Sequence, residues 1–342
     1  MNSTHVLEVV VTARPSWARV QSILSHYTSS FGTESARVSL VGPALSKRYG
    51  DLSLTVSSRY KTKLFPSLHE SDSFENIALS AIEGGSALAR YWGQDRPSAV
   101  LVIADRSETL AVSMTAALMQ IPIIHLQGGE ISGSIDDKVR DTNSKLADLH
   151  FTTNAFTCER LISMGEKREN VVIIGCPSID LVQEILLLNS NEPLSEHELG
   201  GVGATFPLDS AFGLIMFHPD TANSLENDFW ISKLFAMIKA SKLNWFWFWP
   251  NPDHGTESIS KRIRQERENG GLNNVRFVIN LKPEVFIRLA SKSKILIGNS
   301  SFGIREASFL GLPVVNLGLR QSGRQYASNV LSFNKDEFDM NW

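Results

Sequence analysis

Ten short apolar runs recur along this chain of 342 residues, and segments with the apolar spacing of helices separate them. Buried parallel strands consist of such continuous runs because helices cover both faces of their sheet. Strands that alternate with helices in this way indicate βαβ units. The sequence therefore predicts an α/β protein built on doubly wound parallel sheets. The predicted strands occupy residues 6–11, 38–41, 99–103, 121–126, 171–174, 213–217, 244–249, 275–279, 294–297 and 313–317.

The apolar runs fall into an earlier and a later group, and one segment separates the two groups. Residues 189–210 are rich in Asn, Ser, Glu, Gly and Pro and have no strong apolar period, which is typical of a connection between domains. A chain of this length suits about two domains of ordinary size. We therefore expect an N-terminal domain at 1–188, a linker region at 189–210 and a C-terminal domain at 211–342.

The composition excludes several classes of protein. A hydrophobic content of 42% and a net charge of -3 are those of an ordinary globular chain, with no global attraction to nucleic acid or to an anionic membrane. Cys158 and Cys176 are the only cysteines, so neither a disulfide framework nor a zinc site of Cys/His spacing is expected. The start of the chain lacks the pattern of a signal peptide, and no apolar run has the length of a membrane span. We expect a cytoplasmic protein.

Polar residues follow most of the predicted strands directly. In open α/β sheets ligands bind beyond the carboxyl ends of the strands, because loops and helix N-termini converge there. A single Asp, Asn or Ser at such a point is an ordinary helix cap, but a whole series predicts a binding cleft between the two domains. The polar strand ends are residues 12–15, 105–106, 127–130, 218–220, 251–253 and 298–301.

The stretch 298–307 has the residue types of a phosphate site. Ser300 and Ser301 supply hydroxyls, Gly303 permits close approach of a ligand, and the N-terminus of a predicted helix over 304–310 attracts anions. The alternative is that serine caps a helix and nothing binds. Glu306 suits either the binding of ribose hydroxyls or the role of a capping-box acid.

Three acids and an arginine follow the strand at 121–126 within a short distance. Glu130 lies beside two glycines, and Asp136, Asp137 and Arg140 follow it. A carboxylate at a strand end is suited to proton transfer when its pKa is adjusted; the alternative is a helix cap with its salt bridges. The motifs of dinucleotide dehydrogenases, P-loop enzymes, zincins and α/β-hydrolases are absent from the sequence.

Several segments together resemble the UDP-N-acetylglucosamine 2-epimerase family, in the family's order and spacing. The resemblance implies a GT-B-like fold, with two Rossmann-like domains and a cleft between them. The GGE and SGSIDD sequences within these segments are similar to the hydrolysing branch, which releases free N-acetylmannosamine and UDP. The matching segments are 12–15, 104–109, 125–130, 132–137, 144–146, 299–307 and 316–324.

The resemblance also implies a mechanism and a set of site residues. UDP would leave by anti elimination, and water would then add to the glycal. Asp105, Glu130 and Asp136 would be the acid/base carboxylates, in an order that the sequence leaves open, and His218 would protonate the leaving group. Binding of UDP or of the sugar would fall to Arg14, Arg106, Arg140, Asn251, Ser300, Ser301, Glu306 and Arg320.

The same resemblance implies a nucleotide-sugar substrate, no metal or other cofactor, a homo-oligomer (dimer or tetramer), and a role in the synthesis of sialic acids and related nonulosonic acids. Three features depart from the family pattern. Asp141 stands where histidine is usual, Arg19 stands where lysine is common, and the sequence ends at Trp342 where further helices would return to the first domain. We therefore expect a closing helix that is either shortened or lost. A GT-B glycosyltransferase and a non-catalytic UDP-sugar-binding protein remain alternatives.

Overall fold

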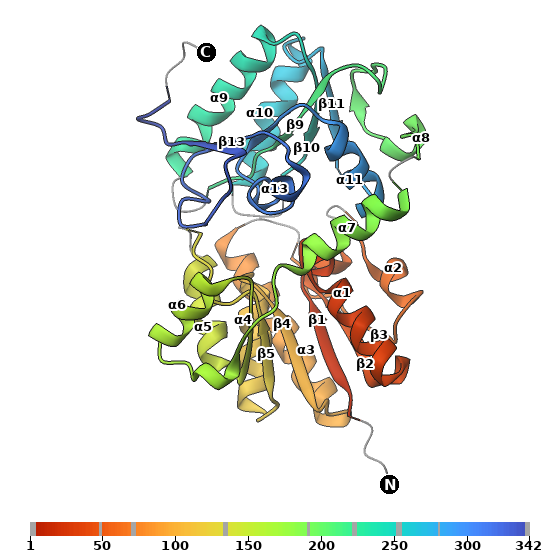
Figure 1. Cartoon of the computed structure of the whole chain (residues 1–342), viewed down its shortest axis with the longest axis vertical. Helices are drawn as coiled ribbons and strands as arrows, with labels where there is room; N and C mark the ends of the chain where they lie inside the picture. Colours follow the sequence, from red (N-terminus) through yellow and green to blue (C-terminus); the bar gives the residue numbers. More distant parts are fainter. Residues whose placement is uncertain are drawn as a thin grey trace. The chain divides into compact units, whose positions relative to one another are not determined.

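The computed structural model describes residues 5–47, 50–69, 73–132, 136–189, 192–220, 224–250, 255–279 and 281–338. The chain divides into two compact units. The first comprises residues 1–130 and 135–181, and the second comprises residues 131–134 and 182–342. In the described parts each unit has a sheet of seven strands with helices packed on it (Figure 1). Each unit is therefore a Rossmann-like α/β fold, as the strand pattern predicts.

The sheet of the first unit is parallel in all its pairings, in the order β3-β2-β1-β4-β5-β6-β7. The chain moves outward in one direction from β1 to β3 and in the other from β4 to β7, so the order reverses between β1 and β4. Such a switch point is where open α/β sheets bind ligands. The strands are β1 Leu7–Val11, β2 Ala36–Val41, β3 Thr62–Phe65, β4 Ala99–Ile103, β5 Ile123–Leu126, β6 Leu149–Thr152 and β7 Val171–Ile173. The helices are α1 Arg14–Phe31, α2 Ser53–Ser57, α3 Phe74–Gln94, α4 Ser107–Leu118, α5 Asp136–Leu146 and α6 Ala155–Ser163.

The sheet of the second unit has the order β14-β13-β12-β9-β10-β11-β8. All its pairings are parallel except that of β8 with β11. Its strands are β8 Val202–Gly203, β9 Phe212–Met216, β10 Asn244–Phe248, β11 Val275–Val278, β12 Leu296–Gly298, β13 Val314–Leu317 and β14 Val330–Phe333. The helices of the rest of the chain are α7 Pro177–Asn189, α8 Glu196–Leu199, α9 Ser224–Ala240, α10 Thr256–Glu268, α11 Pro283–Lys292, α12 Ser301–Ile304 and α13 Glu306–Leu310.

All ten predicted strands are present, within two residues of the predicted limits. The sequence pattern missed β3, β6, β8 and β14. Three of these, β3, β8 and β14, lie at sheet edges and keep exposed or partly exposed residues. A strand that is buried on neither face needs no continuous apolar run, and so it leaves no such signal in the sequence.

In its described part, the segment expected as a linker, residues 189–210, contacts β11 and α11. Strand β8 pairs with β11, and Arg276 Nε donates to the carbonyl of Gly200 at 2.7 Å. The buried Arg288 donates through Nη1 to the carbonyl of Pro193 at 3.2 Å. Two arginines thus fix the segment to the second unit, because their guanidinium groups satisfy main-chain carbonyls that a loop leaves unpaired.

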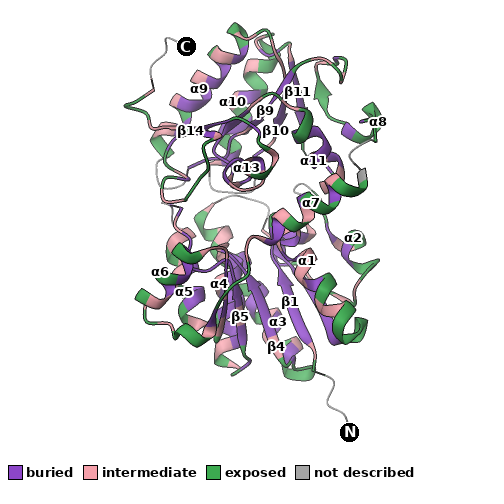
Figure 2. Ribbon diagram, viewed as in Figure 1, coloured by how far each residue is buried: buried purple, intermediate pink, exposed green. Residues whose placement is uncertain are grey.

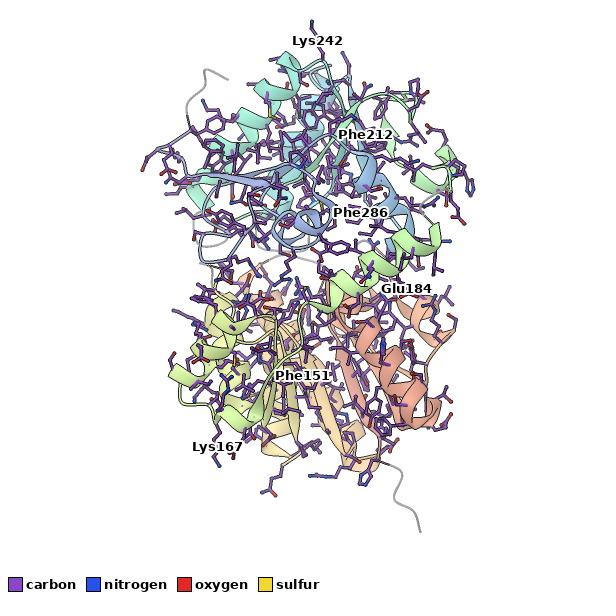
Figure 3. All side chains as sticks on the ribbon, in the orientation of Figure 1. Phe151, Lys167, Glu184, Phe212, Lys242 and Phe286 are labelled. Atoms are coloured by element: carbon purple, nitrogen blue, oxygen red, sulfur yellow. The ribbon has the colours of Figure 1, made fainter. Side chains whose placement is uncertain are left out.

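Bulky side chains of β10 fill both faces of the second sheet. Trp245 and Trp247 belong to the core cluster that also includes Trp230 of α9. On the other face Phe246 meets the ring of Phe212 edge-on, with the ring centroids 5.2 Å apart. Phe212 is labelled in Figure 3. Central strands of the two sheets, such as β1, β4, β9 and β10, are accordingly coloured as buried along most of their length (Figure 2). Among the helices of the described ranges, none is long and apolar enough to cross a membrane.

Candidate active site

The candidate acids of the first unit follow β4 and β5. Ala104 and Gln127, the first residues after these strands, have positive φ angles of 57° and 66°. This left-handed conformation is uncommon for residues with a Cβ and costs about 1–3 kcal/mol, so the surrounding structure must hold it in place. Because β4 and β5 are paired in parallel, the two strained turns lie at the same edge of the sheet. Asp105 follows Ala104 directly, and Glu130 lies three residues after Gln127.

Arg140 of α5 joins the acidic residues of this edge. Its side chain is completely buried, and its guanidinium forms ion pairs with Asp105 and Asp137. Nη1 also donates to the main-chain carbonyl of Glu130 at 2.8 Å. Burial opposes the charge, but the carboxylates of Asp105 and Glu130 hold the pKa of Arg140 well above its usual value. A permanent positive charge is therefore fixed between the two turns.

The remaining predicted residues of the first unit lie at the starts of helices. Arg14 begins α1, Asp136 begins α5, and Arg106 precedes α4. Arg106 Nε donates to Glu108 at 3.1 Å. Since α1 and α4 directly follow β1 and β4, the carboxyl edge of one sheet carries Arg14, Asp105, Arg106 and, through Arg140, the main chain of Glu130.

Two glycines allow the Glu130 turn to pack tightly. Gly129 has a φ of 78°, and a Cβ at this position would lie 2.2 Å from the carbonyl oxygen of Thr157. At Gly128 a Cβ would lie 2.8 Å from the Ser144 hydroxyl. Both distances are shorter than a real Cβ contact, so the backbone of the turn packs directly against Thr157 and Ser144. Glu130, which follows, is only 6% exposed.

In the second unit one asparagine fixes the residue that follows β9. Asn299 Oδ1 accepts from the main-chain N–H of His218 at 2.7 Å, and Nδ2 donates to the carbonyl of His218 at 2.8 Å. The carbonyl of Asn299 in turn accepts from Arg320 Nη1 at 3.2 Å and from Gln321 Nε2 at 3.0 Å. The structure thus joins His218 to the neighbourhood of Arg320. Asn299 lies in the polar strand end 298–301 and Gln321 in the matching segment 316–324, but neither of them was assigned a site role from the sequence.

The helix predicted over 304–310 is interrupted at Arg305 in the structure. The structure has two short helices, α12 and α13, that meet at Arg305. Ser300 Oγ accepts from the N–H of Phe302 at 3.3 Å, so this hydroxyl caps α12. A helix of four residues has a small dipole, because the dipole grows with the number of aligned peptides. Anion binding here would therefore depend on hydroxyl and N–H groups more than on a helix dipole.

Glu306 begins α13 and carries an unusual oxygen. Its Oε2 is buried and accepts no hydrogen bond from any residue in the described part of the chain. A buried carboxylate oxygen without a donor costs free energy. This oxygen is therefore a candidate acceptor for hydroxyl groups of a ligand.

Asn251 lies outside the described residues. Asp141, which was identified from the sequence as a departure from the expected family pattern, forms two hydrogen bonds with Arg160, at 2.6 and 2.8 Å. Its carboxylate therefore forms an ion pair that links α5 to α6.

Among the residues that the structure describes, no group of three His, Cys, Asp or Glu is arranged to hold a metal ion.

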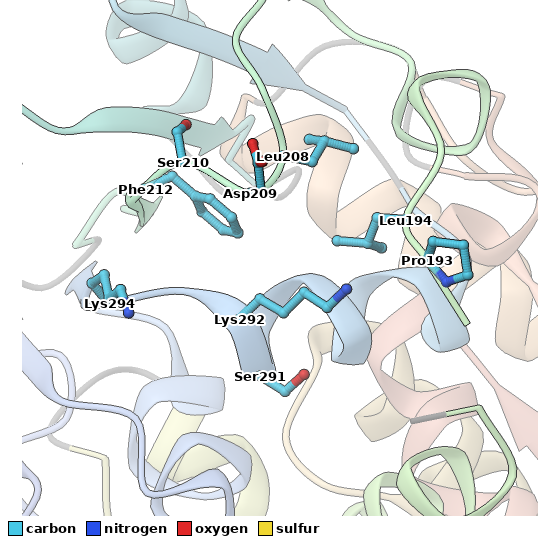
Figure 4. A pocket seen from close by; sticks show the side chains of 9 residues that line it. All are labelled: Pro193, Leu194, Leu208, Asp209, Ser210, Phe212, Ser291, Lys292 and Lys294. Atoms are coloured by element: carbon cyan, nitrogen blue, oxygen red, sulfur yellow. The ribbon is translucent and has the colours of Figure 1, made fainter. Parts of the chain in front are cut away.

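A pocket of about 500 Å³ in the second unit lies elsewhere (Figure 4). Its lining includes Asp209, Phe212, Lys292 and Lys294. Phe212 begins β9, whereas His218 follows the end of that strand. The pocket is thus at the amino edge of the sheet, opposite to the edge that carries His218 and Ser300.

The fold is similar to that of a known protein. The chain is similar in structure to the UDP-GlcNAc 2-epimerase from Methanocaldococcus jannaschii, with a TM-score of 0.79 and 14% identity over 97% of this chain and 90% of that one. The protein is therefore of the GT-B-like class. Residues 44–339 match the UDP-N-acetylglucosamine 2-epimerase family, and the chain belongs to this family.

Two relatives are similar to this chain in sequence. A UDP-N-acetylglucosamine 2-epimerase from Neisseria meningitidis serogroup B is 30% identical over 85% of this chain and 74% of its own. A GDP/UDP-N,N'-diacetylbacillosamine 2-epimerase (hydrolyzing) from Campylobacter jejuni is 27% identical over 97% of this chain and 85% of its own. The family resemblance derived from the strand-end motifs is confirmed.

Proposed function

We propose that this protein is a hydrolysing UDP-N-acetylglucosamine 2-epimerase. It would convert UDP-N-acetylglucosamine, or a related UDP-2-acetamido sugar, to the free 2-epimer and UDP. The observation that carries the proposal is the buried Arg140, which forms an ion pair with Asp105 and binds the main chain of Glu130. The Campylobacter jejuni relative, whose name includes "hydrolyzing", is similar to nearly the whole chain.

The chemistry requires carboxylates that are held in place. A base removes the proton from C2 of the sugar, the electron pair forms the C1–C2 double bond, and the C1–O bond to UDP breaks. Water then adds its oxygen to C1 while a proton returns to C2 from the opposite face. Asp105, Glu130 and Asp136 are the proposed proton carriers, and each such transfer contributes about 10²–10⁴-fold to the rate. The ion pair with Arg140 holds the carboxylate of Asp105 in one orientation.

Binding of UDP is assigned to residues of both units. Arg14 and Arg106 of the first unit offer charge to the diphosphate, since arginine binds phosphate oxygens with two parallel donors. In the second unit His218, Ser300, Ser301 and Arg320 are proposed for the same ligand. The buried oxygen of Glu306 that lacks a donor among the described residues supports a role in binding ribose hydroxyls. The product would supply the synthesis of a nonulosonic acid, such as a sialic acid.

The test is an NMR experiment on the purified protein with UDP-N-acetylglucosamine in heavy water. We expect UDP and N-acetylmannosamine with deuterium at C2, without any acceptor. A UDP-sugar that exchanges deuterium at C2 without release of UDP would instead mean that the protein returns a nucleotide sugar. A glycosyltransferase would need an added acceptor. Binding of UDP with an unchanged substrate spectrum would identify a non-catalytic binding protein for this sugar.

A variant then tests the role of Glu130. Glu130→Gln should lower turnover by at least about 100-fold, because an amide cannot take up the proton. Its affinity for UDP should stay within about threefold of the wild type. The matched control is Glu159→Gln in α6, where the carboxylate pairs with Arg168 at the surface; it should leave both quantities unchanged. Loss of UDP affinity in Glu130→Gln would contradict the assigned role.

A further inference from the structure

The carbonyl of Ala104, the residue before Asp105, receives two hydrogen bonds from buried side chains. His125 Nε2 lies 2.9 Å from this oxygen, and Asn143 Nδ2 donates to it at 3.2 Å. His125 belongs to β5 and Asn143 to α5. Ala104 has a φ of 57°, which an alanine adopts only when its surroundings enforce it. Both lone pairs of the carbonyl are thus used to hold a strained turn.

The contact of Nε2 indicates which ring nitrogen of a neutral His125 carries the proton. Because Nε2 faces a carbonyl, which can only accept, the ring proton is assigned to Nε2. Nδ1 lies 3.0 Å from the hydroxyl of Ser144, one residue beyond Asn143 on the same helix. Burial lowers the pKa of His125 to about 4, although the bond to Ala104 opposes this shift. The ring is therefore neutral at pH 7 and carries no proton to or from a substrate.

Space for this arrangement depends on Gly128. A Cβ at Gly128 would lie 3.0 Å from Nδ1 of His125 and 2.8 Å from the Ser144 hydroxyl. Helix α5 also carries Arg140, which forms the ion pair with Asp105. The 104–105 turn is consequently held from two directions, at its carbonyl by His125 and Asn143 and at its carboxylate by Arg140.

We infer that His125 is a positioning residue, which with Asn143 holds the carbonyl of Ala104 and so directs the carboxylate of Asp105. The inference rests on the proposed function, since it takes Asp105 as one of the acid/base groups. Misplacement of a catalytic group by about 1 Å can cost about 100-fold in rate. The loss of the bond from His125 should therefore appear in turnover rather than in UDP affinity.

Two amide substitutions separate the bonds that His125 makes. The terminal nitrogen of a glutamine reaches about as far as Nε2 of histidine, whereas that of an asparagine reaches only to Nδ1. His125→Gln keeps a donor for Ala104, and His125→Asn keeps only the contact with Ser144. We expect His125→Asn to lower kcat by about 100-fold with KM nearly unchanged, and His125→Gln to restore kcat to within about threefold. Equal values of kcat for the two variants would overturn the inference.

The control histidine lies on the neighbouring strand. His150 of β6 is opposite His125 in the parallel pairing and is equally buried, but no contact joins it to Ala104 among those of the described residues. His150→Asn should keep the wild-type kcat. A decrease of kcat equal to that of His125→Asn would mean that any polar change at this depth has the same effect, and the positioning role would be rejected.

Two measurements decide the inference even if the wild type does not act on UDP-N-acetylglucosamine, in which case the proposed function fails. Nitrogen NMR of the wild type with ¹⁵N-labelled histidine should find His125 neutral at pH 7, with its proton on Nε2. The amide hydrogens of Asp105 and Arg106 should exchange faster in His125→Asn than in His125→Gln. A charged ring, a proton on Nδ1 alone, or equal exchange in the two variants would each overturn the inference.

Discussion

The side-chain amide of Asn299 binds both main-chain polar groups of His218, at 2.7 Å and 2.8 Å. Asn299 is 1% exposed and follows β12, whereas His218 follows the adjacent strand β9. The same pair of strand ends is in close backbone contact, since a Cβ at Gly298 would lie 2.1 Å from the carbonyl oxygen of Met216. The position of His218 is thus decided by β12 as much as by its own strand.

Removal of this amide should affect both stability and binding. Asn299→Ala leaves a buried N–H and a buried C=O without partners, which costs about 2–4 kcal/mol. We expect a lower urea midpoint and a weaker affinity for UDP by calorimetry. Asn274→Ala is the control, because Asn274 binds the carbonyl of Leu243 at 2.8 Å at the other edge of the sheet. If the control weakened UDP binding equally, the effect would be a general loss of stability.

Asp141 should be dispensable for the reaction. Both of its carboxylate oxygens are bound by Arg160, at 2.6 and 2.8 Å, and the pair is partly exposed. Asp141→Asn should therefore cost only about 0–1 kcal/mol of unfolding free energy and leave turnover within about threefold. Arg160→Gln should give the same small loss of stability. A tenfold fall in kcat for Asp141→Asn alone would identify this residue as a proton carrier.

Gly129 and Gly32 form a matched pair of positions with positive φ, at 78° and 89°. Nothing lies within 4 Å of a Cβ at Gly32, whereas a Cβ at Gly129 would lie 2.2 Å from the Thr157 carbonyl. Gly32 has a ψ of 155°, a conformation that is essentially restricted to glycine, so Gly32→Ala should cost about 1–3 kcal/mol from backbone strain alone. Gly129→Ala should cost a further 1–3 kcal/mol or so, because main chain must move, and it should lose turnover. Equal urea midpoints of the two variants would contradict the close packing of the Glu130 turn.

His125 should make the protein more sensitive to acid. An unfolded histidine takes up its proton near pH 6.5, but burial lowers the pKa of His125 to about 4. Between these values the unfolded state binds more protons, so this contribution is present above pH 6.5 and is lost as the pH falls toward 4. Between pH 7 and pH 5 the wild type should lose about 2 kcal/mol more unfolding free energy than His125→Gln.

The difference between wild type and variant is the quantity to measure, because other groups titrate in the same range. Burial raises the pKa of Glu8, which makes the folded state bind more protons on acidification and so opposes the effect of His125. Urea unfolding of both proteins at pH 7 and pH 5 gives the difference directly. If the wild type and His125→Gln differed in unfolding free energy by the same amount at pH 7 and at pH 5, His125 would already be charged or solvated in the folded protein.

Much of the fold followed from the sequence, because the signals concerned are local. Ten short apolar runs between segments of helical spacing predicted buried strands, and each of these ten is a strand in the structure. The strands β3 and β6, which contain polar residues, gave no such signal. The polar strand ends likewise identified Asp105, Glu130, His218 and the serines after β12 as candidates, because the edge of a parallel sheet is set by chain direction.

The sequence by itself determined two sets of parallel strands, the polar residues at their ends, and a resemblance to one family. Only the tertiary structure decided what each polar residue binds. Arg140 meets Asp105 across 35 positions, His125 meets the carbonyl of Ala104 across 21, and Asn299 meets His218 across 81. Hydrogen bonds and ion pairs act only over a few ångströms. Partners so far apart in the chain are therefore chosen by the packing of strands and helices, which local residue patterns do not encode.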